Sequence, residues 1–265
     1  MAITIDANGL DLSKTLKSGQ VFRYQELEPY SFRLHAKDQV CRVWQINDTL
    51  YIDADDLSSV AMWNRYFNTD TEPSEVERIM SATPLLRAAY QYSRGIRFLR
   101  QDPFECLISF IISQQKRIPQ IQASIELLCE KCGPLLSDGS RGFPYAQDIS
   151  RSIIPQLRLG YRGPYVHAAA IEVADGSLVL EDYMYPKVSY QVAMQRLQRI
   201  HGVGTKIADC VALFALGFPN AFPVDTHIIK ILAEPELSDF RWEECGDYAG
   251  LVQQYLYNYA LYNGY

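Results

Sequence analysis

The feature that most constrains the fold is a change in the spacing of apolar residues early in the chain. Residues 3–53 are predicted to form short strands, because segments such as SFRLHA, QVCRVWQI and TLYIDA alternate polar and apolar side chains and are rich in aromatic and β-branched types. From about residue 58 the apolar residues follow a helical spacing that continues to the end. Strands followed by helices, without βαβ alternation, predict an α+β fold with a small N-terminal antiparallel sheet beside a mostly helical body.

This change divides the chain of 265 residues into two regions. We predict an N-terminal β domain with a connecting helix at 1–88 and a helical region at 89–265, in agreement with roughly 150 residues per domain. No apolar stretch approaches the roughly 18 residues that span a bilayer. The N-terminus also lacks the basic start of a secretory signal. We therefore expect a soluble intracellular protein with no membrane partner.

The net charge of −6 argues at first against a nucleic-acid partner. The charges are unevenly distributed, however. Residues 89–234 carry 15 basic and 13 acidic side chains, whereas residues 1–88 carry 9 and 13 and residues 235–265 carry 1 and 5. Only the middle of these three segments is net positive. DNA would thus bind through a local patch and backbone dipoles rather than through an overall basic field.

The six cysteines are too few and too scattered for a disulfide framework in a chain of this length. Cys129 and Cys132 form a CxxC, but it falls in the helical-looking run IQASIELLCEKCG and no second close pair accompanies it. We interpret the cysteines as reduced packing residues and predict no metal site.

One helix start is especially clear in the sequence. Asp102-Pro103-Phe104-Glu105 supplies an N-cap Asp, an N1 Pro and an N3 Glu before the apolar run CLISFII. Since that run is hydrophobic almost all round, we predict a buried helix.

The segment LQRIHGVGTKIADCVALFALG predicts a helix-hairpin-helix at about 188–217. Its first helix is expected to end at His201-Gly202 and its second to close at Gly217. Gly202 and Gly204 permit a tight turn and let backbone N–H groups approach a phosphate without an intervening Cβ. An ordinary αα-hairpin with a glycine turn is the alternative explanation of this pattern.

Three residues near the hairpin have the chemistry of a nucleophilic site. Lys206 lies in the first turn of the second helix, where the helix dipole disfavours a positive charge. Cys210 shares its face, and Asp225 in PVDTH is placed to N-cap a further helix. A free lysine with a pKa of about 10.4 is almost fully protonated at pH 7, so its surroundings would have to lower that pKa. A neutral lysine is a nucleophile for a sugar C1′, with which it forms a Schiff base.

Several motifs together resemble a known family of DNA repair enzymes. HGVGTKIADC and PVDTH are similar to PGVGTK-ADC and PVDVH of the helix-hairpin-helix DNA glycosylases, specifically the eukaryotic-type 8-oxoguanine DNA glycosylases. LKSGQVFRY at 16–24, QDPFECLISFIISQQKRI, LRLGYRGPYV at 157–166 and GDYAGLVQQYLY at 246–257 match further motifs of that family in the right order. The resemblance covers most of the chain. It implies base excision repair: a glycosylase that removes 8-oxoguanine from double-stranded DNA, with an associated AP lyase activity.

The resemblance also implies catalytic roles. Lys206 would displace the base and later carry the β-elimination. Asp225 would stabilise the oxocarbenium-like transition state and help to deprotonate Lys206. No metal or organic cofactor would take part in this chemistry, whereas a structural monovalent cation at the hairpin turn stays an open question.

A further set of residues is implied to bind the flipped base. The base would lie between Cys210 and Tyr257, which stands where the family has Phe, so that aromatic stacking is retained. Gln253 would read the Watson–Crick edge. The carbonyl of Gly19 would accept a hydrogen bond from N7–H, which 8-oxoguanine has and guanine lacks.

The remaining residues that the resemblance identifies would contact DNA. The hairpin glycines would hold phosphates, two residues after the LRLG segment would fill or flank the vacated stack, and a histidine would lie near the target phosphate. The predicted DNA-binding residues are Gly202, Gly204, His227, Gln115, Lys116, Arg117, Tyr161 and Arg162.

One segment departs from the family pattern. SQQKRIPQ stands where the family has SSNNNIAR, which contacts the cytosine opposite the lesion. Gln115 replaces an Asn and Gln120 replaces an Arg. Because a bidentate Arg contact is lost, we expect a relaxed preference for cytosine opposite the lesion. Lys116 and Arg117 would supply phosphate contacts instead.

Three alternative functions fit the sequence less well. A monofunctional alkylpurine glycosylase of the same fold generally lacks a lysine at position 206. The endonuclease III and adenine glycosylase branches carry four cysteines for an iron–sulfur cluster after the hairpin, but here only Cys245 follows Cys210. A non-catalytic DNA-binding module would not need Lys206 together with Asp225. The C-terminus without a basic tail resembles prokaryotic members, so we expect the protein in the cytoplasm, associated with the nucleoid. We also expect a monomer.

Overall fold

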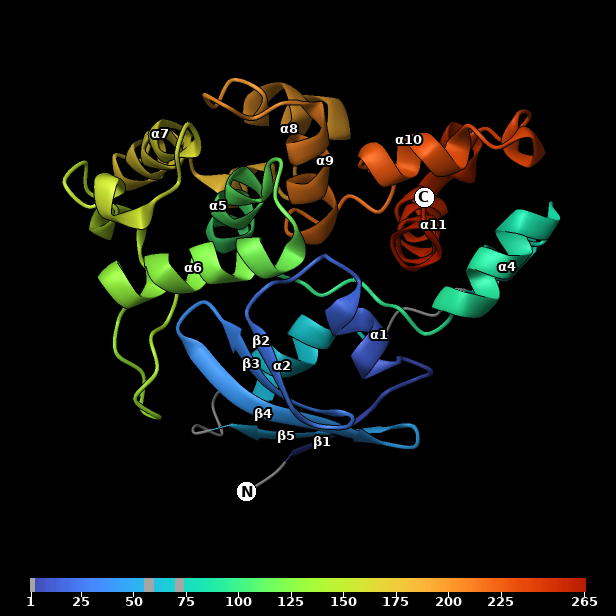
Figure 1. The fold of residues 1–265 in the computed structure, drawn as a ribbon, viewed down its shortest axis with the longest axis horizontal. Coiled ribbons are helices and arrows are strands. Elements are labelled where there is room, and N and C mark those ends of the chain that lie inside the picture. Colours follow the sequence, from blue (N-terminus) through green and yellow to red (C-terminus); the bar gives the residue numbers. More distant parts are fainter. Residues whose placement is uncertain (1–2, 55–59, 70–73) are drawn as a thin grey trace.

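The computed structural model describes residues 3–54, 60–69 and 74–265. Its N-terminal part is a five-stranded antiparallel sheet with the strand order β1-β5-β4-β3-β2. The strands are β1 (Ile3–Asp6), β2 (Tyr24–Glu28), β3 (Ser31–Ala36), β4 (Gln39–Ile46) and β5 (Thr49–Ala54). Helices make up most of the rest of the chain (Figure 1). The predicted α+β fold is therefore confirmed.

The helices continue to the end of the chain, interrupted by short 3-10 segments. They are α1 (Leu12–Lys17), α2 (Val60–Phe67), α3 (Ser74–Met80), α4 (Pro84–Ser93), α5 (Pro103–Ser113), α6 (Ile118–Cys132), α7 (Arg162–Ala174), α8 (Tyr190–Leu197), α9 (Thr205–Phe214), α10 (Thr226–Leu232) and α11 (Ala249–Asn263). Figure 1 shows α1 and α2 between the sheet and the larger helical body.

The helix α1 is a correction to the sequence prediction, which read residues 3–53 as strands. Asp11 caps it by accepting a hydrogen bond from the backbone N–H of Lys14 at 2.9 Å, and Leu12 and Leu16 are buried against the sheet. With only six residues, α1 is too short for helical periodicity to stand out. The predicted change of spacing near residue 58 lies outside the described residues, and helix α2 is described from Val60.

The hairpin helices form as predicted but are shorter. The helix α8 ends at Leu197, before the expected end at His201-Gly202, and α9 ends at Phe214 rather than at Gly217. The chain after α8 tightens into 3-10-like turns, since Ile200 N–H donates to the carbonyl of Leu197 at 3.1 Å. The predicted buried helix is α5, and Asp102 caps it as expected.

Buried apolar side chains form three clusters. One lies between the sheet, α1 and α2, a second surrounds α5 and the hairpin, and a third joins α3 and α4 to α10 and α11. Position 88, the predicted boundary between the two regions, lies inside α4. The division itself stays a prediction.

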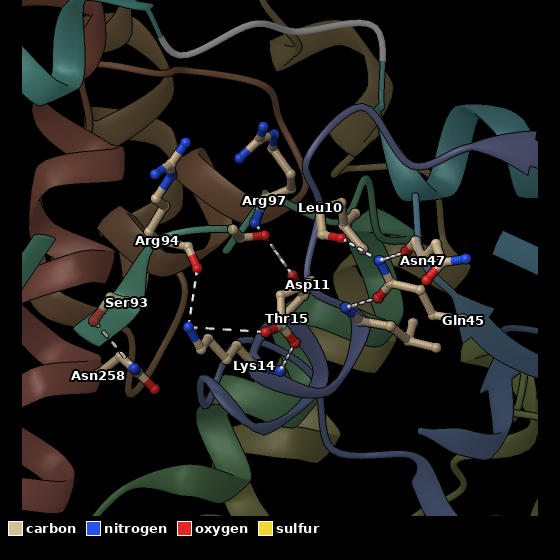
Figure 2. Close-up of polar contacts among 12 residues, drawn as sticks. Leu10, Asp11, Lys14, Thr15, Gln45, Asn47, Ser93, Arg94, Arg97 and Asn258 are labelled. Carbon is tan, nitrogen blue, oxygen red and sulfur yellow. Dashed lines mark hydrogen bonds and ion pairs between the residues drawn. The ribbon is translucent and has the colours of Figure 1, made fainter. Parts of the chain in front are cut away.

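Polar contacts join α1 to the segment that follows α4 (Figure 2). The backbone N–H of Asp11 donates to the carbonyl of Gly95 at 2.8 Å, and the ammonium of Lys14 donates to the carbonyl of Arg94 at 3.1 Å. These bonds fix α1, and with it the segment carrying Gly19, against the helical body.

Candidate active site

A narrow recess lies where α5, α9 and α11 meet the segment after α1. Its volume is about 30 Å³, enough for one or two water molecules. The residues that line it are Gly19, Phe110, Lys206, Cys210, Phe214, Pro223, Asp225, Gln253, Gln254 and Tyr257. The recess therefore brings together both predicted catalytic residues and all four predicted base-binding residues.

The two predicted catalytic residues come from the starts of two helices. Lys206 lies in the first turn of α9, and its ammonium nitrogen is 5.1 Å from the centre of the Phe110 ring. Asp225 caps α10 by accepting a hydrogen bond from Ile228 N–H at 2.9 Å, which holds its carboxylate in place. The capping role and the catalytic role are compatible, because a carboxylate has further acceptor positions.

Cys210 and Tyr257 line the recess from α9 and α11. Burial raises the pKa of the Cys210 thiol to about 11, although the charge of Lys206 opposes this shift. Cys210 is therefore a neutral packing surface at pH 7 rather than a nucleophile. Burial also raises the pKa of Tyr257, whose ring packs edge-on against His227 at 5.8 Å.

Gly19 is the position where the backbone comes closest to Tyr257. Its φ of +77° favours glycine, and a Cβ added there would lie 2.9 Å from Cε1 of Tyr257. No side chain therefore fits between this backbone and the recess.

Two adjacent glutamines of α11 line the recess. Gln253 Nε2 donates to the carbonyl of Pro223 at 2.9 Å, and Gln254 Nε2 donates to the carbonyl of Ser18 at 2.8 Å. Both Oε1 atoms are buried without a hydrogen-bond partner among the described residues. The family resemblance implied Gln253, whereas no motif in the sequence indicated Gln254.

The recess opens into a groove of about 910 Å³. The groove lining contains Gln115, Lys116, Arg117 and His227 from the predicted DNA-binding set, and also Lys17 and Tyr262. Four basic side chains and one carboxylate line it. A chain with a net charge of −6 thus has a locally cationic groove, as a site for a polyanion requires.

The two hairpin glycines differ in what surrounds them. Gly202 has a φ of +87°, and a Cβ added to it would lie 2.2 Å from the Tyr165 ring. Gly204 caps α9 with a φ of −90°, and a Cβ added to it would meet no protein atom within 4 Å. Gly202 is therefore required by the turn, whereas Gly204 leaves the first N–H groups of α9 open to an external acceptor.

Gln114, which no sequence motif indicated, holds the loop before α6. Gln114 donates from Nε2 to the carbonyl of Gly202 at 3.2 Å, and its own carbonyl accepts a hydrogen bond from Nε of Arg162 at 2.7 Å. Gln115, with a φ of +51°, is exposed beside it. This network ties the loop to the hairpin turn.

Arg162 and Gln120 have structural partners. The guanidinium of Arg162 is buried against backbone carbonyls, and the exposed ring of Tyr161 lies 4.4 Å from it. Gln120 accepts a hydrogen bond from Arg117 N–H at 3.0 Å at the start of α6. Tyr161, Arg162, Gly202 and Gly204 do not line the groove itself.

The described residues contain neither a metal-binding cluster nor a membrane-spanning helix. No group of three or more His, Cys, Asp or Glu side chains within 3–54, 60–69 and 74–265 is arranged to hold a metal ion. In the same part of the chain, no helix has the length and apolar character needed to cross a membrane.

Comparison with known proteins identifies the family. The family described as 8-oxoguanine DNA glycosylase, N-terminal domain, matches residues 2–107. The structure of MBOgg1 in complex with a low-affinity DNA ligand is similar with a TM-score of 0.90 and 33% sequence identity, over 100% of this chain and 96% of that one. The chain belongs to the helix-hairpin-helix 8-oxoguanine DNA glycosylases.

Two other members of this glycosylase family are also similar to the chain. The 8-oxoguanine glycosylase/lyase of Clostridium acetobutylicum, solved with double-stranded DNA containing cytosine opposite 8-oxoguanine, has a TM-score of 0.89 and 29% identity over 100% of this chain and 96% of that one. The N-glycosylase/DNA lyase of Saccharomyces cerevisiae is 28% identical over 261 residues, 86% of this chain and 69% of the relative. The glycosylase similarity thus extends beyond the N-terminal region to the helices that carry Lys206, Asp225 and Gln253.

Proposed function

We propose that this glycosylase excises 8-oxoguanine from double-stranded DNA and then cleaves the strand 3′ to the abasic site. The observation that carries the proposal is a single recess that contains Lys206, Asp225, Cys210, Tyr257 and the backbone of Gly19. The names of the relatives described above support the same activity.

Lys206 is the nucleophile in this mechanism. Its neutral amine attacks C1′ of the flipped nucleotide while the C1′–N9 bond breaks, and the base leaves with the bonding electrons. The carboxylate of Asp225 lines the same recess, where it stabilises the positive charge that develops on the sugar and accepts a proton from the amine.

The lyase step follows from the covalent intermediate. Opening of the sugar ring converts the C1′–Nζ adduct into a protonated imine. The imine accepts electrons when C2′ loses a proton, so that the C3′–O bond breaks and the 3′ phosphate leaves. We propose that this chemistry requires no metal or organic cofactor, because the amine of Lys206 supplies both the nucleophile and the electron sink.

The base is selected by contacts along the recess. Cys210 and Tyr257 cover its two faces, Gln253 reads its Watson–Crick edge, and the Gly19 carbonyl accepts the N7–H of 8-oxoguanine. Guanine has no hydrogen on N7 and would leave that carbonyl unpaired. Since about 30 Å³ is far less than a purine needs, the walls of the recess must separate when a base enters.

DNA is the partner of this site. Gly202 and Gly204 place backbone N–H groups for a phosphate, with or without a bound monovalent cation at the turn, and Lys116, Arg117 and His227 line the groove. Tyr161, beside Arg162, supports extrusion of the lesion. Gln115 contacts the strand opposite the lesion. The enzyme has a relaxed preference for cytosine opposite 8-oxoguanine. We propose that the protein acts as a monomer at the nucleoid in the cytoplasm.

The experiment that tests the mechanism traps the Schiff base. Wild type and Lys206→Gln are incubated with a duplex containing one 8-oxoguanine in the presence of borohydride, together with Lys230→Gln as a matched control. Lys230 is an exposed lysine of α10 that does not line the groove. Wild type and the control variant should form a covalent adduct, and Lys206→Gln should not.

Other results would support different functions. Release of the base without an adduct in wild type would indicate a monofunctional enzyme, as in the alkylpurine branch. Binding to DNA with neither adduct nor release, also with duplexes carrying other lesions, would indicate a non-catalytic module.

A further inference from the structure

The amide oxygen of Gln254 is an unusual feature of the recess. Gln254 is 1% exposed and lines the recess beside Gln253, which is 4% exposed. Its Oε1 has no hydrogen-bond partner among the described residues, and neither has that of Gln253. A buried acceptor without a partner is costly, so two of them in one recess indicate a ligand that supplies donors.

The orientation of both amides is fixed by the backbone. Gln254 Nε2 donates to Ser18 at 2.8 Å, and Gln253 Nε2 donates to Pro223 at 2.9 Å. Turning either amide over would place its oxygen against a carbonyl oxygen, two acceptors with no hydrogen between them. Each Nε2 keeps a second N–H, but the amide atoms without any hydrogen-bond partner among the described residues are the two oxygens, and both are acceptors.

We infer that Gln254 is a specificity-determining residue, whose Oε1 adds a second acceptor to that of Gln253 and selects a base with two neighbouring N–H donors on its Watson–Crick edge. This inference rests on the proposed excision of 8-oxoguanine. A guanine-type edge offers the ring N1–H and the exocyclic 2-amino group. A hypoxanthine-type edge keeps N1–H but lacks the amino group, and an adenine-type edge replaces N1–H with an acceptor.

The test compares two bases that differ only in the 2-amino group. Single-turnover excision is measured on duplexes that contain 8-oxoguanine or 8-oxohypoxanthine in the same sequence, opposite cytosine. Wild type should excise 8-oxoguanine roughly five- to tenfold faster, the effect of one neutral hydrogen bond. In Gln254→Met, which has a similar shape but no amide, this ratio should fall to about 1–2.

A purely structural role of Gln254 makes a different prediction. If the amide only holds Ser18 and the adjoining Gly19, Gln254→Met slows excision of both bases by the same factor and the ratio stays that of wild type. The inference would also be overturned if Gln253→Met loses the preference for 8-oxoguanine over 8-oxohypoxanthine while Gln254→Met keeps it. Both excision rates are measured on the same enzyme preparation, so a partly inactive variant does not change their ratio.

Two further measurements keep the test decisive. Gln254→Asn serves as the second variant if Gln254→Met does not fold. It keeps a polar amide but withdraws it by one methylene, so it should also lower the ratio of the two excision rates. Equal rates on the two bases in wild type would overturn the inference without any variant. If wild type excises neither base, the proposed function itself fails, which separates that failure from the failure of this inference.

Discussion

The hydroxyl of Tyr190, at the start of α8, donates a hydrogen bond to the buried carboxylate of Asp209 in α9. The two helices of the hairpin are thereby joined one residue away from Cys210. Burial raises the pKa of Asp209 to about 6, and the hydrogen bond from Tyr190 opposes that rise. The position of the recess wall thus depends on a polar contact within the hairpin.

Replacing Tyr190 with Phe should destabilise the protein by about 1–3 kcal/mol, because a buried carboxylate loses its donor. The folded-state pKa of Asp209 lies above its ordinary value, so the stability that its protonated form contributes is lost as the pH rises through about 6. Because Tyr190→Phe removes a hydrogen bond that lowers this pKa, it raises the pKa of Asp209 further. The loss of unfolding free energy in Tyr190→Phe should therefore be larger at pH 8 than at pH 5. Urea unfolding at both pH values measures this, with the exposed Tyr30→Phe as the control. An equal cost at the two pH values would contradict it.

Glu105 should give the protein a second pH dependence. It is 6% exposed, accepts a hydrogen bond from Lys37 N–H at 2.5 Å, and has a pKa that burial raises to about 7. A raised pKa means that its contribution to stability is present below its ordinary value of 4.5 and is lost as the pH rises through about 7. The loss amounts to up to about 3 kcal/mol.

Glu105→Gln keeps an acceptor without the charge and should remove this pH dependence. Above pH 7 it should be more stable than wild type in urea unfolding, whereas the exposed Glu130→Gln should follow the wild-type curve. If the free energy of unfolding of Glu105→Gln falls between pH 5 and pH 8 as steeply as that of wild type, another group is responsible for the pH dependence.

The two hairpin glycines should separate folding from DNA binding. Gly202→Ala should cost about 2 kcal/mol or more, because it combines a positive φ with a clash against Tyr165. Gly204→Ala should change stability by less than about 1 kcal/mol, because its Cβ meets no protein atom, yet it should weaken DNA binding. Thermal unfolding and fluorescence anisotropy with duplex DNA measure the two effects. If Gly204→Ala binds duplex DNA as tightly as wild type, Gly204 is not part of the DNA interface.

Gly19→Ala should abolish base excision through its contact with Tyr257. Gly139→Ala is the matched control, since Gly139 has a φ of +81° but no atom within 4 Å of an added Cβ. Both variants should lose about 1–2 kcal/mol of stability from the left-handed backbone, and Gly19→Ala somewhat more. Only Gly19→Ala should lose excision in a single-turnover assay. Normal excision by a folded Gly19→Ala would show that the close approach of Gly19 to Tyr257 is not needed for excision.

The sequence alone determined the features that depend on neighbours along the chain. The caps at Asp102 and Asp225, the glycine turn, and the shared face of Lys206 and Cys210 all follow from spacings of a few residues. Such contacts recur at fixed intervals, so they are visible without the fold. The ends of α8 and α9 do not follow from such local spacings; in the turn after α8, for example, His201 packs edge-on against Tyr165 of α7 at 4.7 Å.

Tertiary structure decided how the distant parts meet. Only the folded chain brings Gly19 against Tyr257 and directs the amide of Gln254 toward Ser18. These contacts join residues more than 200 positions apart. No periodicity encodes them, because they arise from the packing of α11 against the segment after α1. The sequence therefore predicted Lys206 and Asp225 as a catalytic pair, and the packing of α11 determined that Gln253 and Gln254 line the same recess.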